Sequence, residues 1–157
     1  MRCRWREFLV LGAGLTVVAR GAAAQHRIRE LGLQSIATLS DPALAVVGLY
    51  GAVRSSGRTR LSLGLGAGVS DGDLAVRGEL LGHFLLSPDQ RRKPGFYLAG
   101  GVAGVEGAVS RGYVVLTAGV EQHPRGPSGW ALELGFGGGA RLALAYRWRW
   151  FSGMLPN

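Results

Sequence analysis

Residues 60–69 read Arg-Leu-Ser-Leu-Gly-Leu-Gly-Ala-Gly-Val, with an apolar residue at every odd position and a polar residue or glycine at every even position. Successive side chains on a β-strand point to opposite faces, so this alternation predicts a strand with one apolar face and one polar face. The stretch from Leu142 to Trp150 alternates in the same way, with large apolar side chains opposite arginine and alanine. A period of two in both stretches favours an all-β fold.

Turn-forming residues divide the chain after Gln25 into eight extended segments. The segments are residues 31–40, 43–54, 58–69, 73–86, 95–106, 112–122, 129–137 and 140–151. Most of them are close to the length of a tilted strand that crosses a bilayer, which needs roughly 9–11 residues. Helical periodicity of useful length does not occur in this part of the sequence.

Side-chain size indicates which face of these segments meets lipid. The apolar face carries large Leu, Trp, Phe and Tyr residues, whereas the polar face is mainly Gly, Ala and Ser with occasional Arg and Glu. An eight-stranded barrel has an interior just wide enough for side chains, so small inward residues leave space for a few long charged ones. We therefore predict an eight-stranded antiparallel up-and-down transmembrane β-barrel with leucine toward lipid.

Two segments support a different fold. Residues 43–53 and 96–105 are apolar on both faces, so the sequence does not define which of their side chains point inward. A soluble β-sandwich would bury such segments between two layers. A soluble β-sandwich or lipocalin-like cup with leucine inside is therefore the alternative.

The beginning of the chain has the composition of a secretory signal peptide. Residues 1–7 are rich in arginine, residues 8–19 are uncharged and mostly apolar, and Ala22-Ala23-Ala24 provides a small-residue cleavage site. The apolar stretch is shorter than the roughly 20 residues that a membrane-spanning helix requires. We expect residues 1–24 to be a signal peptide, cleaved after export by the general secretory route, and residues 25–157 to form a single β-barrel domain.

Composition excludes several functional classes. Cys3 is the only cysteine and lies in the predicted signal peptide, so the mature chain is expected to lack disulfides and thiolate metal ligands. Cleavage removes four arginines and one glutamate and lowers the formal charge from +8 to +5. The remaining basic residues are spread among turns and inward positions instead of forming one stripe, so we expect no nucleic-acid partner. The glycine-rich stretches lack the Lys-Ser/Thr of a phosphate loop, and no cofactor or metal is expected.

The alternating segments, the cleavage site and the closing strand together resemble the small eight-stranded outer-membrane β-barrels, the OmpA- and OmpX-like superfamily. The closing strand, Leu142 to Phe151, is similar to the carboxy-terminal aromatic signature that such proteins present to the barrel assembly machinery. The resemblance implies an outer-membrane location in a Gram-negative-type cell, with outer-membrane lipid and the assembly machinery as partners. Two features differ from the family pattern: residues 152–157 follow the last aromatic residue, and the connections that would face outward are short.

Two sets of residues are candidates for a functional site. The first is a lumen charge network of inward-facing residues, in which arginine–carboxylate pairs are expected because an unpaired charge in a narrow lumen is costly. Its members are Arg60, Arg77, Glu79, His83, Glu121, Glu133, Arg141, Arg147 and Arg149. The second is an aromatic girdle near one rim, typical of a membrane interface. Its members are Phe96, Trp130, Tyr146, Trp148, Trp150 and Phe151.

These residues favour a structural or interaction role in the cell envelope without catalysis. Some small barrels are lipid A-modifying hydrolases that use His, Ser and a carboxylate, but Leu85 and not serine stands two residues after His83, and the chain has no nucleophile elbow. We therefore expect the protein not to be an enzyme. The excess of inward arginine over glutamate supports the alternative of a small-anion pore, and the soluble fold supports that of a periplasmic lipocalin-like carrier.

Overall fold

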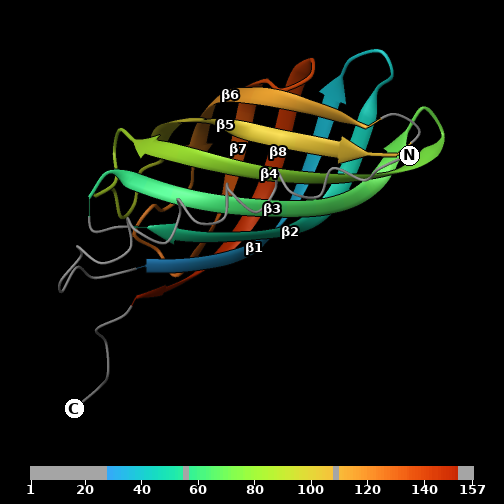
Figure 1. Ribbon diagram of the computed structural model, residues 1–157. Coiled ribbons are helices and arrows are strands. Elements are labelled where there is room, and N and C mark those ends of the chain that lie inside the picture. Colours follow the sequence, from blue (N-terminus) through green and yellow to red (C-terminus); the bar gives the residue numbers. More distant parts are fainter. Residues whose placement is uncertain (1–27, 55–56, 108–109, 152–157) are drawn as a thin grey trace, which may run out of the picture.

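The computed structural model describes residues 28–54, 57–107 and 110–151. Eight strands follow one another, each pairs antiparallel with the next, and β1 also pairs with β8 to close the sheet into a barrel (Figure 1). The strands are β1 (Ile28–Leu39), β2 (Leu44–Arg54), β3 (Thr59–Ser70), β4 (Asp73–Leu85), β5 (Gly95–Glu106), β6 (Arg111–Glu121), β7 (Ser128–Phe136) and β8 (Ala140–Phe151). The predicted all-β up-and-down barrel is confirmed. The predicted signal peptide and residues 152–157 lie outside the described residues.

The alternation of residues 60–69 has the orientation expected of a membrane-spanning barrel. On β3, Leu61, Leu63 and Leu65 are 53–56% exposed on the outside, whereas Arg60 and Ser62 are at most 4% exposed inside. All eight strands expose large apolar side chains in this way. A soluble protein does not expose so much contiguous apolar surface, because its free energy in water would be high. The outer surface is therefore the lipid-facing one, and the soluble lipocalin-like cup, which needs leucine inside, is the wrong fold.

The two segments without a defined phase are β2 and β5, and both point an aromatic side chain into the lumen. Tyr50 and Tyr97 are 3% and 1% exposed. The inward face of β2 also carries Leu44 and Val46, which pack with Ile36 and others in an apolar cluster inside one end of the barrel. On β5, Tyr97, Ala99 and Ala103 belong to two further apolar clusters in the lumen. Both strands are therefore apolar on both faces because one face meets lipid and the other packs against apolar side chains inside the barrel.

Inward glycines let neighbouring strands approach closely in so small a barrel. A Cβ at Gly48 would collide with the carbonyl oxygen of Leu65 and with Gly66 on the adjacent β3. Backbone, unlike a flexible side chain, cannot move away cheaply, so glycine is required at this close approach. The high glycine content of the chain thus follows partly from the strong curvature of the sheet.

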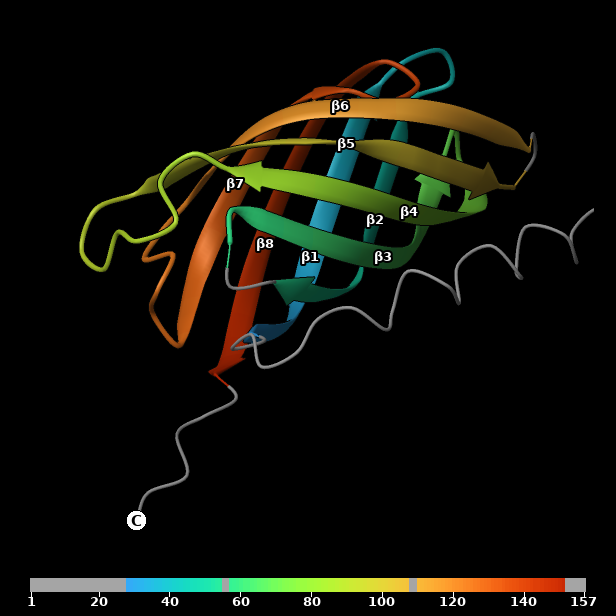
Figure 2. The same ribbon diagram turned by 60° about the vertical axis from the view of Figure 1, so that its left-hand side comes forward.

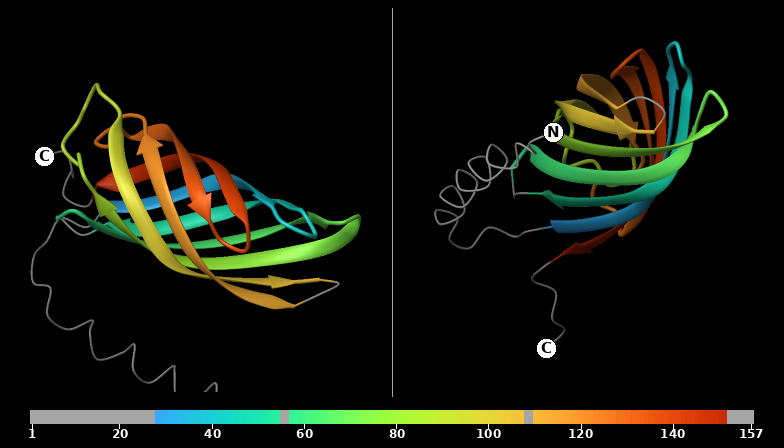
Figure 3. Two further views of the ribbon diagram at one scale, coloured as in Figure 1. Left: turned by 90° about the horizontal axis from the view of Figure 1, so that it is seen from above. Right: turned by 45° about the vertical axis from the view of Figure 1, so that its right-hand side comes forward.

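The two rims of the barrel differ in their connections. β1 begins and β8 ends at one rim, which we call the terminal rim, and the connections there are residues 55–58, 86–94 and 122–127. The opposite rim has the connections 40–43, 71–72, 107–110 and 137–139. Residues 86–94 extend beyond the strands on the side where β8 ends (Figures 2 and 3). No helix in the described part of the chain is long and apolar enough to cross a bilayer.

The outward leucines yield a depth-dependent prediction. Leu63→Arg, near the middle of β3, should lower the free energy of unfolding in phospholipid vesicles by about 2–4 kcal/mol, because hydrocarbon does not solvate a guanidinium. Leu74→Arg, next to the end of β4, is the matched control and should cost only about 0–1 kcal/mol. Urea titration followed by the gel mobility of the folded barrel measures both. Equal costs at the two positions would contradict the placement of a bilayer around these strands.

Candidate functional site

The structure gathers the nine predicted members of the lumen charge network inside the barrel. Each is at most 6% exposed, and they come from β3, β4, β6, β7 and β8. Small residues alternate with them on the inward face, as Ala143 and Ala145 do between Arg141 and Arg147. The small neighbours leave the volume that the long arginine side chains occupy, so these charges meet across the lumen.

Glu121 is the hub near the terminal rim. Its Oε2 accepts hydrogen bonds from three guanidinium groups: Arg60 at 2.7 Å, Arg147 at 3.2 Å and Arg149 at 3.3 Å. Charge-assisted bonds of this kind are stronger than neutral ones. One carboxylate therefore holds together arginines from two strands, β3 and β8.

A second set of ion pairs continues the network toward the opposite rim. Glu133 accepts from Arg147 at 3.1 Å through Oε1 and from Arg141 at 2.8 Å through Oε2. Arg141 donates its other terminal nitrogen to Glu79 at 2.9 Å, and Glu79 accepts from Nε of Arg77 at 3.3 Å. The ion pairs thus form one continuous series from Glu121 to Arg77 along the lumen.

Two tyrosines support the middle of this series. The guanidinium carbon of Arg147 lies 4.5 Å from the ring centroid of Tyr50 and 5.5 Å from that of Tyr97, and that of Arg60 lies 4.8 Å from Tyr97. An aromatic face attracts a cation, and more strongly where water is excluded. The Tyr97 hydroxyl also donates to Glu133 at 2.8 Å. The tyrosines therefore fill the space around the arginines and help to balance their charge.

Sequence reasoning missed four charged or aromatic residues that face inward: Tyr50, Tyr97, Glu30 and Arg54. The tyrosines lie on the two strands whose phase was undefined. Glu30 lies 3.5 Å from Arg60 and belongs to β1, which begins at Ile28 and not at the predicted Leu31. Extension of the alternation of β1 toward the amino terminus would have placed Glu30 inside.

Backbone carbonyls of the terminal-rim connections bind further donors of two arginines, Arg54 and Arg149. Arg54 donates to the carbonyl oxygens of Pro88 and Pro124, both at 3.0 Å, and Arg149 donates to that of His123 at 3.1 Å. Within residues 28–54, 57–107 and 110–151, the buried charged side chains comprise six arginines and four glutamates, so cations are in excess. At this end of the lumen the excess is compensated by carbonyl dipoles.

His83 has a serine partner that linear spacing did not reveal. Ser62, from the neighbouring β3, lies with its Oγ 2.7 Å from Nε2 of His83, so a serine that is not at the expected spacing along the sequence comes from the adjacent strand. The other ring nitrogen, Nδ1, lies 3.2 Å from Nη2 of Arg60. Because a guanidinium only donates, Nδ1 is the acceptor and Nε2 carries the proton that it donates to Ser62. In this tautomer His83 does not accept a proton from Ser62, as a general base must.

The chemistry of the lumen is therefore that of paired charges. In the described ranges no three His, Cys, Asp or Glu side chains are grouped so that they could hold a metal ion. The carboxylates Glu79, Glu121 and Glu133 each accept from at least two partners. The arrangement holds these carboxylates in fixed positions.

The predicted aromatic girdle lies on the outer surface toward the terminal rim. Phe96, Trp130, Trp148 and Trp150 are exposed, whereas Tyr146 is half-buried. Trp130 and Trp148 pack edge-on against the ring of Tyr146, with centroids 4.8 Å and 5.0 Å away. These three form one cluster across β7 and β8. Phe151 is half-buried at the end of β8.

Comparison with known proteins agrees with this geometry. Neither a protein-family model nor a curated protein matches the chain. Among solved structures, the N-terminal β-barrel domain of Pseudomonas aeruginosa OprF is similar with a TM-score of 0.67 at 11% sequence identity, over 81% of this chain and 100% of that domain. The chain has the fold of the OprF barrel. The resemblance to the small eight-stranded outer-membrane barrels is thereby confirmed for the fold.

The hub position yields a prediction about stability. Glu121→Gln should lower the free energy of unfolding by about 3–5 kcal/mol, because it leaves three buried guanidinium groups without their shared anion. Asp89→Asn is the control: it breaks an exposed ion pair with Arg125 and should cost at most about 1 kcal/mol. Urea unfolding of both variants in the same lipid provides the comparison. A loss of under about 1 kcal/mol for Glu121→Gln would show that the network does not stabilise the barrel.

Proposed function

We propose that this protein is an integral outer-membrane β-barrel with a closed lumen and a structural role in the cell envelope, without channel or enzyme activity. The outward apolar surface and the OprF-like fold support the membrane location. The continuous series of ion pairs from Glu121 to Arg77 is the observation that carries the structural role.

A closed lumen follows from the packing of that series. Arg60, Arg147 and Glu121, which come from β3, β8 and β6, are at most 2% exposed. Tyr50 and Tyr97 fill the space beside the arginines. A conducting pore needs a hydrated path along groups that bind ions only weakly. The side chains here bind one another instead, which supports a structural plug.

The small-anion pore is the second candidate, and the excess of arginine favours it. The two arginines that the carboxylates compensate least are Arg54, bonded to carbonyls at the terminal rim, and Arg77, at the other end of the ion-pair series. The closed network separates them. An anion attracted to either end therefore has no continuous cationic path to the other.

The short connections favour a structural role over recognition of a soluble partner. Opposite the terminal rim, β3 and β4 are joined by residues 71–72 and β7 and β8 by residues 137–139. Turns of this length present little surface to water. Contacts with lipid along the outward leucines are then the main interaction that the barrel makes.

Membrane extraction followed by single-channel recording tests the proposal. The protein should stay in membranes washed with carbonate or urea, require detergent for release, and give no stable conductance when reconstituted into planar bilayers. A variant that carries both Arg60→Ser and Arg147→Ser is the positive control, because it removes two long, fully buried side chains that fill the lumen beside Glu121. It should conduct while keeping the gel mobility of a folded barrel.

Two outcomes would overturn the proposal. Release into the soluble fraction without detergent would exclude the membrane location. A stable, anion-selective wild-type conductance that Arg77→Ala or Arg141→Ala abolishes would establish the pore.

A further inference from the structure

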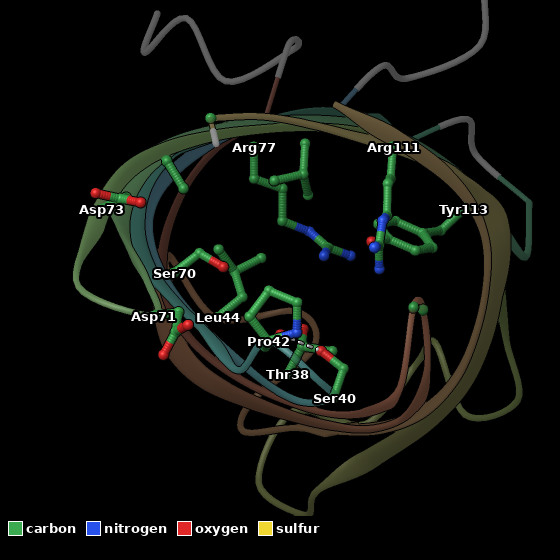
Figure 4. A pocket seen from close by; sticks show the side chains of 15 residues that line it. Thr38, Ser40, Pro42, Leu44, Ser70, Asp71, Asp73, Arg77, Arg111 and Tyr113 are labelled. Atoms are coloured by element: carbon green, nitrogen blue, oxygen red, sulfur yellow. Dashed lines mark hydrogen bonds between the residues drawn. The ribbon is translucent and has the colours of Figure 1, made fainter. Parts of the chain in front are cut away.

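The lumen has a second compartment that the structural role does not use. A cavity of about 170 Å³, which we call the vestibule, lies between the ion-pair series and the rim opposite the terminal rim. It is seen end-on in Figure 4. At about 30 Å³ per water, this volume corresponds to roughly five or six waters, so it suits a small ligand and not a lipid chain.

Arg77 is the buried group that points to a ligand. It is 1% exposed and lines the vestibule, yet Nη1 and Nη2 have no hydrogen-bond partner among the described residues. Buried polar groups are nearly always paired, and an unpaired pair of donors on a charged group is costly. The one bond that the structure gives its guanidinium is that from Nε to Glu79 at 3.3 Å.

The surroundings of Arg77 extend the positive charge. Arg111 also lines the vestibule, and Figure 4 shows both guanidinium groups projecting toward the middle of the ring of strands, next to Tyr113. Asp73, by contrast, is directed outward at the wall. Thr38 adds a buried hydroxyl whose Oγ1 is without a hydrogen-bond partner. The lining thus contains two arginines and two aspartates, Asp71 and Asp73, and it is the two guanidinium groups that project toward the middle of the cavity.

We propose that the vestibule binds a small free oxyanion of the phosphate class, held by Arg77 with Arg111 and the hydroxyls of Thr38 and Tyr113. The two terminal nitrogens of a guanidinium match the oxygens of a phosphate in a bidentate pair. In the structure, Nη1 and Nη2 of Arg77 are covered by neighbouring atoms. Binding therefore requires a rotation about the terminal side-chain bonds of Arg77 that turns these nitrogens toward the ligand. Because the ion-pair series closes the lumen between the vestibule and the terminal rim, the bound anion does not cross the barrel.

Gly137 is part of this site. A Cβ at Gly137 would lie 3.3 Å from Nη2 of Arg77 and 3.1 Å from Cγ2 of Val115. A side chain larger than that of alanine at position 137 would therefore occupy the space next to the guanidinium of Arg77. Gly137→Val therefore blocks the site without changing a charge.

Nuclear magnetic resonance of the detergent-solubilised ¹⁵N-labelled protein tests the proposal. Inorganic phosphate, titrated at constant ionic strength in a phosphate-free detergent, should shift the amide resonances of Gly137 and Gly138 saturably. Arg77→Met should raise the dissociation constant at least about tenfold, because the bidentate pair is lost. It should fold, since Glu79 keeps its 2.9 Å bond to Arg141. Arg125→Met, which removes a cation from the terminal rim, is the control and should leave the dissociation constant unchanged.

Gly137→Val keeps the proposal testable if Arg77→Met fails to fold, and it too should weaken phosphate binding. Shifts that grow linearly without saturation, or saturable binding that persists in a folded Arg77→Met or Gly137→Val variant, would overturn the site. Micelles doped with phosphatidylglycerol distinguish the source of the phosphate. Shifts at Gly137 with the lipid alone and none with inorganic phosphate would overturn the assignment to a free oxyanion.

Discussion

The whole structure depends on how an eight-stranded barrel accommodates buried charge. Its interior is only wide enough for side chains, so a charged group there has little water to solvate it and must find an opposite charge. Glu121 meets this requirement by accepting from arginines of β3 and β8, and Glu133 by accepting from two arginines of β8 and from the hydroxyl of Tyr97 on β5. The same bonds that neutralise these arginines therefore also connect opposite walls of the barrel and fill its lumen.

This constraint explains the distribution of residue sizes. A lumen that contains several arginines and two tyrosines needs small residues beside them, and glycine and serine are the small residues that alternate with leucine along β3. Lipid outside requires large apolar side chains, so the pattern of a soluble barrel is inverted. A single alternation of residues along each strand therefore provides both a lumen for paired charges and an outer surface for lipid.

The sequence predicted the eight strands because its alternation and turn residues are local signals. It also predicted the inward direction of Arg60, Glu79 and Glu121, since each lies on a strand with a clear period of two. It did not predict Tyr50 and Tyr97, because their strands are apolar on both faces. It also did not predict the contact of His83 with Ser62. That contact depends on the register between β3 and β4, and the residue pattern within one strand does not determine this register. Arg77 shows the same limit. Only the positions of the surrounding described residues reveal that two of its guanidinium nitrogens have no hydrogen-bond partner among them.

The claim that the leucines of residues 60–69 meet hydrocarbon is tested most directly by spin-label accessibility in vesicles. The chain beyond residue 27 has no cysteine, so nitroxide labels at Leu61→Cys, Leu63→Cys and Leu65→Cys report each position separately. A label at Arg125→Cys, in the exposed 122–127 connection, gives the reference for contact with water. Lipid contact predicts frequent collisions with molecular oxygen and rare collisions with a water-soluble nickel chelate at all three leucine positions. Nickel collisions as frequent as at Arg125, or protection of all three labels from both reagents, would contradict the inside-out barrel.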